Sequence, residues 1–298
     1  MDESEWLTER FQEHRPHLKA VAYRMLGSLA EADEALQESW IRLDRSDIGG
    51  VENLGGWLTT VVARVCLNML RSRKSRHEEP LDAHVPDPVV SADEGIDPED
   101  EALLADSVGL AMLVVLETLA PAERLAFVLH DMFGVPFEEI APIVGRSATA
   151  ARQLASRARR RVKGVAPVPD EDLARQREVA AAFLAAARAG DFDALVAILD
   201  PDVVLRADGG VLPAGASRVI HGAEAVAGQA LAFSRSRQPL PLVRPVLVNG
   251  GPGFVSRTAD GRPLSVVGIT AAGGRIVEID ILADPQRLRR LHLEELDE

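Results

Sequence analysis

The sequence predicts a multidomain fold of two all-α domains, the second with a helix-turn-helix, followed by an α+β domain shaped as a cone or barrel. Up to residue 165 the apolar residues recur at helical spacing. From Val203 onward, short alternating runs are separated by Gly or Asp-Gly turns, as in strands. Two stretches rich in proline or acid interrupt the pattern. We therefore divide the chain into domains 1–77, 106–165 and 173–298, joined by an acidic, extended linker (78–105) and a short linker (166–172).

Length and composition are those of a globular protein with two or three domains. The chain has 298 residues, of which 47% are hydrophobic, and one cysteine, Cys66, which excludes an intramolecular disulfide. The charged N-terminus lacks an apolar signal region, and no run is long enough to span a bilayer. We expect a cytoplasmic protein without a membrane partner. His14 and His17 lack a nearby third ligand, and no phosphate-cradling loop is present, so we expect no metal and no cofactor.

Charge is strongly segregated along the chain. The net charge of −13 disfavours DNA binding at first sight. Basic residues nevertheless gather at 71–76 and again between Arg152 and Lys163, where six occur without an acid. No Lys or Arg lies between Glu78 and Glu123. Such a distribution allows local basic patches to bind phosphate while the whole chain stays acidic.

The first block, residues 5 to about 76, reads as helical, with Pro16 expected to break it. Ser28 and Glu31 form a capping-box pattern that opens a helix over Leu29–Leu43. A Gly-rich loop, Arg45–Gly56, precedes a helix that begins at Trp57 and ends in the basic cluster. Its polar side carries Arg64, Asn68 and Arg71. A loop that leads into such a helix is suited to single-stranded nucleic acid.

The stretch Phe137–Lys163 predicts a helix-turn-helix. Gly145 supplies the turn and Ser147 caps the second helix, which has an apolar stripe of small residues. Pro142 predicts that the first helix is short or bent. The opposite face of the second helix offers polar and basic side chains to a major groove: Thr149, Gln153, Ser156 and Arg160, with Arg152 and Arg157 on the flanks. The alternative is a solvated basic helix of a helical bundle.

Three segments together resemble bacterial sigma factors of the extracytoplasmic-function (ECF) type. They are FQEHRPHLKAVAYRMLGSLAEADEALQESWIRL, NLGGWLTTVVARVCLNMLRSRKSR and LETLAPAERLAFVLHDMFGVPFEEIAPIVGRSATAARQLASRARRRV, within Glu5–Lys163. The resemblance implies binding to core RNA polymerase and promoter DNA, without a catalytic residue of the protein's own. The implied polymerase-binding residues are Asp33, Gln37, Glu38 and Trp40. The implied minus-ten residues are Asn53, Arg64, Asn68, Arg71, Arg73 and Lys74. The implied minus-thirty-five residues are Thr149, Arg152, Gln153, Ser156, Arg157 and Arg160.

The third block, 173–298, resembles the SnoaL-like domain that some sigma factors carry at the C-terminus. Those proteins have WLP-type, DGG-type and NPDKL-type motifs. The counterparts here are His84-Val85-Pro86, Asp208-Gly209-Gly210 and Asp284-Pro285-Gln286-Arg287-Leu288, each a partial match. The resemblance implies that this domain regulates the other two in cis by intramolecular contact, with a small ligand of unknown identity as a further partner.

Two other functions fit parts of the sequence. A SnoaL-like isomerase or cyclase with an appended DNA-binding region would use an acid/base pair drawn from Asp208, His221, Asp260 and Asp280. Asp208 and Asp260 each precede Gly, which favours turn carboxylates instead. An operator-binding repressor would bind duplex DNA tightly without polymerase. The sigma factor is the prediction taken forward.

Overall fold

The structure is a computed structural model that describes residues 3–44, 53–75, 83–92, 109–210, 217–236, 240–291 and 293–297. These residues form two compact units. The first comprises the described residues up to Ser75 together with Leu113–Val165. The second comprises residues 83–92, 109–112 and the described residues from Ala166 onward. No helix in the described ranges is long and apolar enough to cross a membrane.

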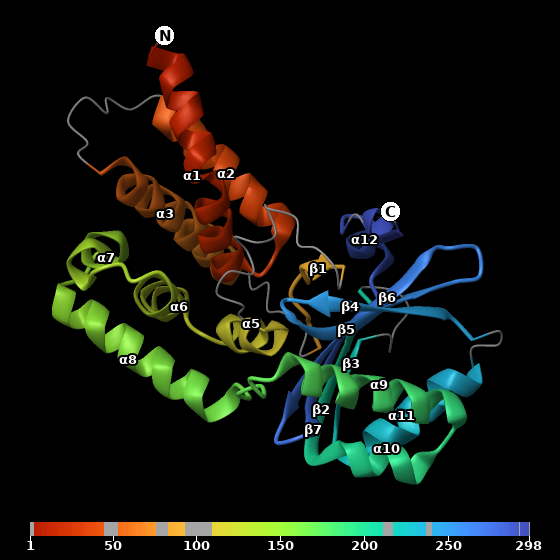
Figure 1. The fold of residues 1–298 in the computed structure, drawn as a ribbon. Helices are drawn as coiled ribbons and strands as arrows, with labels where there is room; N and C mark the ends of the chain where they lie inside the picture. Colours follow the sequence, from red (N-terminus) through yellow and green to blue (C-terminus); the bar gives the residue numbers. More distant parts are fainter. Residues whose placement is uncertain are drawn as a thin grey trace. The chain divides into compact units, whose positions relative to one another are not determined.

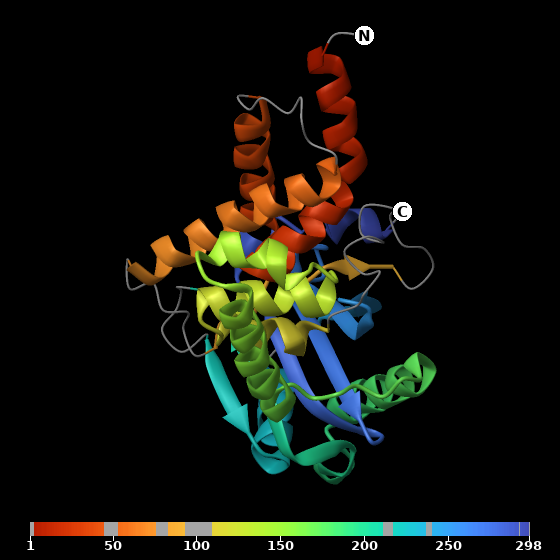
Figure 2. The ribbon, with the colours of Figure 1, turned by 90° about the vertical axis from the view of Figure 1, so that its left-hand side faces the viewer.

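Three helices begin the first unit: α1 (Glu3–Leu26), α2 (Leu29–Asp44) and α3 (Leu54–Ser75). They pack against one another, as Figures 1 and 2 show. The predicted break at Pro16 is wrong, because α1 continues through it. Phe11 on one side of Pro16 and Leu18 and Met25 on the other are at most 5% exposed. Their burial offsets the backbone hydrogen bond that proline removes.

The start of α3 also differs from the prediction. The helix begins at Leu54 rather than Trp57, because the side chain of Asn53 accepts a hydrogen bond from the backbone N–H of Gly56 at 3.0 Å. This cap stabilises a first turn that contains two glycines. The rest of the predicted loop, residues 45–52, lies outside the described residues.

The helix-turn-helix belongs to the first unit. Its elements are α6 (Pro121–Phe127), a π-helical turn η1 (Val128–Met132), α7 (Phe137–Val144) and α8 (Ala148–Val165). Helix α8 contacts α6 and α7 (Figure 1). Helix α7 is short, as predicted, and runs through Pro142. The helix expected over Asp106–Leu119 is observed as α5 (Leu110–Glu117), and residues 106–108 lie outside the described ranges.

A buried arginine joins α6 to α1 within this unit. Arg124 is 3% exposed, and its Nε donates to the carbonyl oxygen of Arg24 at 3.3 Å. The Arg24 guanidinium lies 4.8 Å from the centre of the Phe133 ring, which also meets His17 edge-on. Burial lowers the pKa of Arg124 to about 10. The three-helix group and the helix-turn-helix therefore share a polar and aromatic contact.

The second unit is an α+β fold built on a curved sheet of seven strands, in the order β1-β4-β5-β6-β7-β2-β3. Strands β2 and β7 are parallel, and the other neighbours are antiparallel. The strands are β1 (Val90–Ser91), β2 (Leu199–Asp208), β3 (Arg218–His221), β4 (Leu242–Val248), β5 (Gly251–Arg257), β6 (Pro263–Ala272) and β7 (Arg275–Leu282). The helices are α9 (Leu173–Ala189), α10 (Phe192–Ile198), α11 (Ala223–Ser236), α12 (Pro285–Leu288) and the 3-10 turn η2 (Leu293–Asp297). The predicted Asp260-Gly261 hairpin joins β5 to β6, with Gly261 at a φ of 85°.

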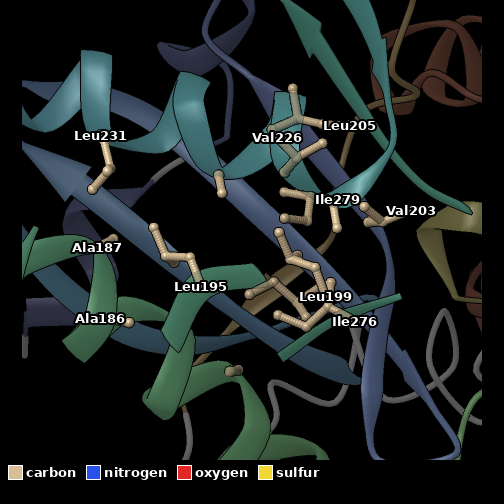
Figure 3. Packing of buried hydrophobic residues seen from close by; sticks show 14 of the residues in the cluster. Ala186, Ala187, Leu195, Leu199, Val203, Leu205, Val226, Leu231, Ile276 and Ile279 are labelled. Carbon is tan, nitrogen blue, oxygen red and sulfur yellow. The ribbon is translucent and has the colours of Figure 1, made fainter. Parts of the chain in front are cut away.

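The core of this unit lies between one face of the sheet and helices α9, α10 and α11. Leu195 of α10, Val226 of α11 and Ile276 of β7 are fully buried there, as Figure 3 shows. Val203 and Leu205 of β2 contribute to this core, whereas the residues that alternate with them point to the opposite face. The cluster of polar residues around Asp208, described below, lies on that opposite face.

Part of the chain between the two helical domains belongs to the second unit. Val90 and Ser91 pair with Val248 and Leu247 as strand β1, at the edge of the sheet. The Val89 backbone N–H donates to the Asn249 side chain at 3.1 Å, and the Asn249 N–H donates to the Val89 carbonyl at 2.8 Å. Residues 83–92 are therefore fixed to the C-terminal domain. The remainder of the predicted linker, 78–82 and 93–105, lies outside the described residues.

Candidate nucleic-acid interface and linker contacts

The turn of the helix-turn-helix has the geometry that its sequence predicts. Gly145 ends α7 with a φ of 68°, a left-handed conformation that glycine adopts without steric cost. The Ser147 hydroxyl accepts a hydrogen bond from the Ala150 N–H at 3.2 Å, which caps α8. Both predicted local signals are confirmed, and they fix the direction in which α8 leaves the turn.

Helix α8 separates its small apolar residues from its polar and basic ones. Ala151, Ala155, Ala158 and Val162 are buried. Small side chains here allow α8 to approach α6 and α7 closely. The residues predicted to contact the upstream promoter element all lie on the remaining surface of the helix: Thr149, Arg152, Gln153, Ser156, Arg157 and Arg160.

Three arginines of α8 are held by carboxylates from other elements. Arg157 Nε lies 2.6 Å from Glu123 Oε1, and Arg161 Nη1 lies 3.8 Å from Glu123 Oε2. Arg159 is paired with Asp131 of η1. Sequence reasoning missed both acids as part of this surface, because they precede α8 by many residues and only the tertiary fold brings them to it.

The second predicted DNA surface lies along α3. Arg64, Asn68 and Arg71 are exposed at helical spacing, and Lys74 is exposed at its end. Two further residues of this set have structural partners. Asn53 caps α3, and Arg73 is ion-paired with Glu31 and donates to the Leu26 carbonyl at 3.5 Å. The structure therefore presents four of these side chains together and ties two of them to the fold.

The predicted polymerase-binding residues share α2 but differ in their surroundings. Asp33 pairs with Arg15 at 3.5 Å and with Lys19 at 3.7 Å, both from α1. Gln37 is exposed, and Glu38 pairs with Arg42 one helical turn later. Trp40 is half-buried against Phe11, with ring centres 5.1 Å apart. The acidic side chains line the exposed part of the helix, while the tryptophan also packs inward.

The three predicted regulatory motifs meet at Asp208, the last residue of β2. Its Oδ2 lies 3.2 Å from His84 Nδ1, accepts from the Val85 N–H at 3.2 Å, and pairs with Arg287 Nη1 at 2.8 Å. Its Oδ1 accepts from the Gly210 N–H at 3.0 Å. The carboxylate thus binds the linker, its own turn and α12 at once.

Arg287 completes this arrangement from the other side. Its Nε donates to Asp87 Oδ1 at 2.7 Å and its Nη2 donates to the Val85 carbonyl at 2.6 Å. We call His84, Val85, Asp87, Asp208 and Arg287 the linker clasp. Sequence reasoning missed Asp87 and gave Arg287 no role, although Arg287 lies inside the predicted motif.

The other motif residues support the clasp. Val85, Pro86 and Leu288 are buried. Asp284 caps α12 by accepting from the Gln286 N–H at 2.8 Å, and Pro285 begins that helix. The Gly209 N–H donates to the Ser217 hydroxyl at 3.1 Å. Gly210 has a φ of 74°, and a Cβ there would lie 2.7 Å from the Asp284 carboxyl carbon. Glycine is therefore required for close approach of this turn to α12.

The clasp sets the charge state of Asp208. Burial by itself would raise the pKa of this carboxyl group. The hydrogen bonds from His84, Gly210 and Val85, together with the positive charge of Arg287, outweigh burial and lower the pKa to about 2. Asp208 is therefore a carboxylate at neutral pH and well into the acid range.

The four candidate acid/base residues do not form a catalytic pair. Asp208 is occupied by the clasp, and His221 is exposed at the end of β3. Asp260 is exposed and pairs with Arg262 at 2.7 Å. Asp280, 2% exposed, shares Arg206 with Glu278. Burial, with Glu278 nearby, raises the pKa of Asp280 well above its ordinary value. The described residues contain no group of three or more His, Cys, Asp or Glu able to hold a metal ion.

A hollow of about 370 Å³ lies within the second unit where both connecting segments meet the sheet. Gly109 and Leu110 line it from one connector and Pro169–Glu171 from the other. Gln176 and Thr270, 8% and 9% exposed, contribute polar groups. Its volume is at the lower end of the range for small-ligand sites.

Fold and surfaces together define a class of protein. Two helical groups each carry an exposed basic helix, one of them in a helix-turn-helix, as in a transcription protein that contacts DNA at two places. The family model for sigma-70 region 2 matches residues 10–76, and the model for sigma-70 region 4 matches residues 110–162.

Two relatives match the chain over nearly its whole length. The chain is 35% identical to the probable ECF RNA polymerase sigma factor SigI of Mycobacterium tuberculosis, over 99% of both chains. It is 36% identical to the ECF RNA polymerase sigma factor SigJ of Mycobacterium tuberculosis, over 96% of this chain and 94% of SigJ. The crystal structure of SigJ superposes with a TM-score of 0.77 at 34% identity, covering 95% of this chain and 98% of that chain.

The chain belongs to the ECF sigma factors of bacterial RNA polymerase. The predicted fold class is confirmed in its architecture: two helical sigma domains are followed by an α+β domain. The protein is a transcription initiation factor that works with core RNA polymerase and promoter DNA, and not an enzyme, as the relatives' shared function shows. The isomerase or cyclase alternative is accordingly not favoured.

Proposed function

We propose that the two exposed basic helices divide promoter recognition between them. Helix α8 reads the minus-thirty-five element through Thr149, Arg152, Gln153, Ser156, Arg157 and Arg160. Helix α3 contacts the minus-ten element through Arg64, Asn68, Arg71 and Lys74, with Asn53 and Arg73 at the same surface. The polar and basic outer surface of α8 is the observation that carries this assignment.

On α2, Asp33, Gln37, Glu38 and Trp40 form the proposed docking face for core RNA polymerase. Its acidic and exposed side chains contrast with the basic faces of α3 and α8, which supports separate partners. We also propose that the protein acts in the cytoplasm, where polymerase and promoters meet.

The test of the α8 assignment is Arg160→Ala. A bidentate contact from arginine to a base is worth about 1–3 kcal/mol of discrimination, so transcription from a mapped promoter should fall about fivefold or more. Gly164→Ala, an exposed change at the end of the same helix, is the control. Unchanged transcription by Arg160→Ala would remove this residue from the recognition surface.

We infer that the C-terminal domain regulates the sigma domains in cis through the linker clasp. The clasp fixes residues 83–92, which lie in sequence between the two helical domains. When it is closed, eight peptide steps separate Ser75 from Ala83, a span of about 28 Å at most. When the clasp opens and β1 also leaves the sheet, the connector regains the whole length up to Gly109, about 115 Å at full extension. Clasp closure therefore restricts how far apart the two promoter-reading helices can reach.

The clasp is tested by Arg287→Gln, with deletion of Asp284–Leu288 as the stronger change. Arg287→Gln removes the charge that binds Asp87 and Asp208, so promoter output should change while preference among promoter sequences stays the same. Arg290→Gln is a matched control, because Arg290 is exposed three residues away. Equal output and equal polymerase affinity for the wild type, Arg287→Gln and the deletion variant would contradict regulation through the clasp.

The hollow between the connectors is the proposed site for a small ligand. A molecule bound there would touch both connectors and the sheet, and would stabilise the folded unit by an amount that rises with the logarithm of its concentration relative to its Kd. The low-molecular-weight fraction of a bacterial extract should raise the melting temperature of the full chain. The rise should be smaller for Thr270→Val, which removes one lining hydroxyl with little change of shape. No rise in either protein would contradict the proposal.

A further inference from the structure

We propose that Glu123, which lies outside the recognition helix, positions two arginines of α8 and so determines specificity for the upstream promoter element. The inference rests on the proposed role of α8 in reading that element. It adds a residue that contacts no DNA itself and acts through Arg157 and Arg161.

Glu123 is the third residue of α6, and its side chain is 14% exposed. Its two carboxylate oxygens point to different arginines: Oε1 is 2.6 Å from Arg157 Nε, and Oε2 is 3.8 Å from Arg161 Nη1. The two arginines are four residues apart and therefore adjacent on one side of α8. One carboxylate thus aligns two cations along the helix.

The ion pair with Glu123 leaves the two terminal nitrogens of Arg157 available for DNA. The carboxylate takes the Nε–H, so both terminal nitrogens remain free to donate. The side chain is 50% exposed. A guanidinium that is already fixed loses less conformational entropy when its fork meets a guanine edge. Glu123 therefore fixes the orientation in which the Arg157 guanidinium meets a base edge.

The other basic residues of α8 show the contrast. Arg159 is paired with Asp131, and the Arg152 guanidinium lies 5.1 Å from the centre of the Phe137 ring. Among the described residues, Arg160 and Lys163 form no ion pair. A cation without such a restraint is free to turn to phosphates as well as to a base edge, and attraction to phosphates adds affinity without specificity. The carboxylate of Glu123 withholds two arginines from such contacts.

Removal of the carboxylate should therefore have two effects. Glu123→Gln leaves Arg157 free to rotate, so discrimination at the bases it reads should fall by about fivefold or more. It also frees Arg157 and Arg161 to contact DNA phosphates. The slope of log K for DNA binding against log salt concentration should therefore steepen by about 0.9 for each additional phosphate that they neutralise. A loss of helix stability alone would weaken all sequences equally and would leave the salt slope unchanged.

The experiment uses the full chain in complex with core polymerase. A mapped promoter is randomised in its upstream element, transcribed as a pool, and the transcripts are sequenced to give a preference profile. Glu123→Gln, Arg157→Gln and the double variant are compared with Glu139→Gln. Glu139 is an exposed carboxylate of α7 without an arginine partner among the described residues, so it controls for the change in charge.

We expect Glu123→Gln and Arg157→Gln to lose preference at the same positions, and the double variant to match Arg157→Gln alone. Glu139→Gln should keep the wild-type profile. An intact profile in Glu123→Gln, or losses that add in the double variant, would overturn the inference. Glu123→Asp retains the charge at the start of α6. It should lose preference without steepening the salt slope, and it replaces Glu123→Gln if that variant fails to fold.

Failure of the broader proposal has a different signature. If the wild-type protein showed no preference in the upstream element, or Arg157→Gln and Arg160→Ala both kept the full profile, α8 would not be the reading helix. If those arginine variants lost preference while Glu123→Gln kept it, only the positioning role of Glu123 would be wrong.

Discussion

Asp208 illustrates how one residue serves the regulation proposed for the whole chain. In sequence it precedes two glycines and reads as a turn carboxylate. In the fold it accepts from Gly210, Val85 and His84 and pairs with Arg287. Both interpretations are therefore true of it: it shapes a turn and it holds the linker. Its depressed pKa results from these partners.

Replacing this carboxylate should weaken the clasp in a pH-dependent way. Asp208→Asn should lower the free energy of unfolding of the second unit by about 2 kcal/mol near pH 7, the size of a hydrogen bond to a charged group. Since the folded pKa of about 2 lies below the ordinary value, the stabilisation is present above about pH 4 and is lost as the pH falls toward 2.

Urea unfolding of wild type and Asp208→Asn at a series of pH values measures this difference. The two free energies of unfolding should converge in acid. A difference that stayed the same from about pH 5 to about pH 2.5 would contradict the assigned role of the carboxylate.

Asn249 is a second residue whose backbone and side chain act together. It has a φ of 49°, the one positive value among the described non-glycine residues, and its amide accepts from Val89. Asn249→Gly removes the side chain but keeps the left-handed backbone, whereas Asn249→Ala also adds strain of about 1 kcal/mol. Alanine should therefore destabilise more than glycine in thermal unfolding. The opposite order would mean that the backbone conformation at 249 differs from the one described.

At the scale of elements, α8 depends on its cap. Ser147→Ala should cost about 1 kcal/mol, because the first-turn N–H groups lose the hydroxyl acceptor. Hydrogen exchange should accelerate at the amides of residues 149–151, and recognition of the upstream element should weaken with it. Ser72→Ala, an exposed serine in the interior of α3, is the control. Unchanged exchange at the start of α8 would show that Ser147 is not the cap in solution.

Elements specified by local chemistry were predictable from sequence, and those specified by distant partners were not. Gly145, Ser147 and Asp260-Gly261 each act over a few residues, and all three predictions are confirmed. Pro16 was misjudged, because burial on both sides of it overrides the local cost in α1. The start of α3 was placed three residues late, because Asn53 caps a turn that its glycines disfavour.

The candidate site divides in the same way. The outer residues of α8 follow from helical periodicity, so sequence alone named them. Other contacts join elements that are far apart in sequence. They are the ion pair of Glu123 with Arg157 and the pairs that Arg287 forms with Asp87 and Asp208. Such pairings are fixed by the tertiary fold, and no spacing rule in the chain points to them.

At the scale of the molecule, the sigma domains and the C-terminal domain share one connecting segment. Residues 83–92 lie between the sigma domains in sequence and belong to the C-terminal unit in structure. This arrangement suits the extra domain to control of the connector, and the full-length relatives from Mycobacterium tuberculosis match the chain across the same span. The roles assigned to individual promoter-binding residues remain predictions.

The most direct test of this account is run-off transcription with bacterial core RNA polymerase on fragmented genomic DNA, which assumes no promoter. Full-length protein is compared with a chain that ends at Val168. We predict specific start sites that depend on the protein, with a different yield from the shortened chain because it lacks the partners of the clasp. Absence of specific starts and of polymerase binding from both forms would contradict the central claim, and equal yield from both would contradict control by the C-terminal domain.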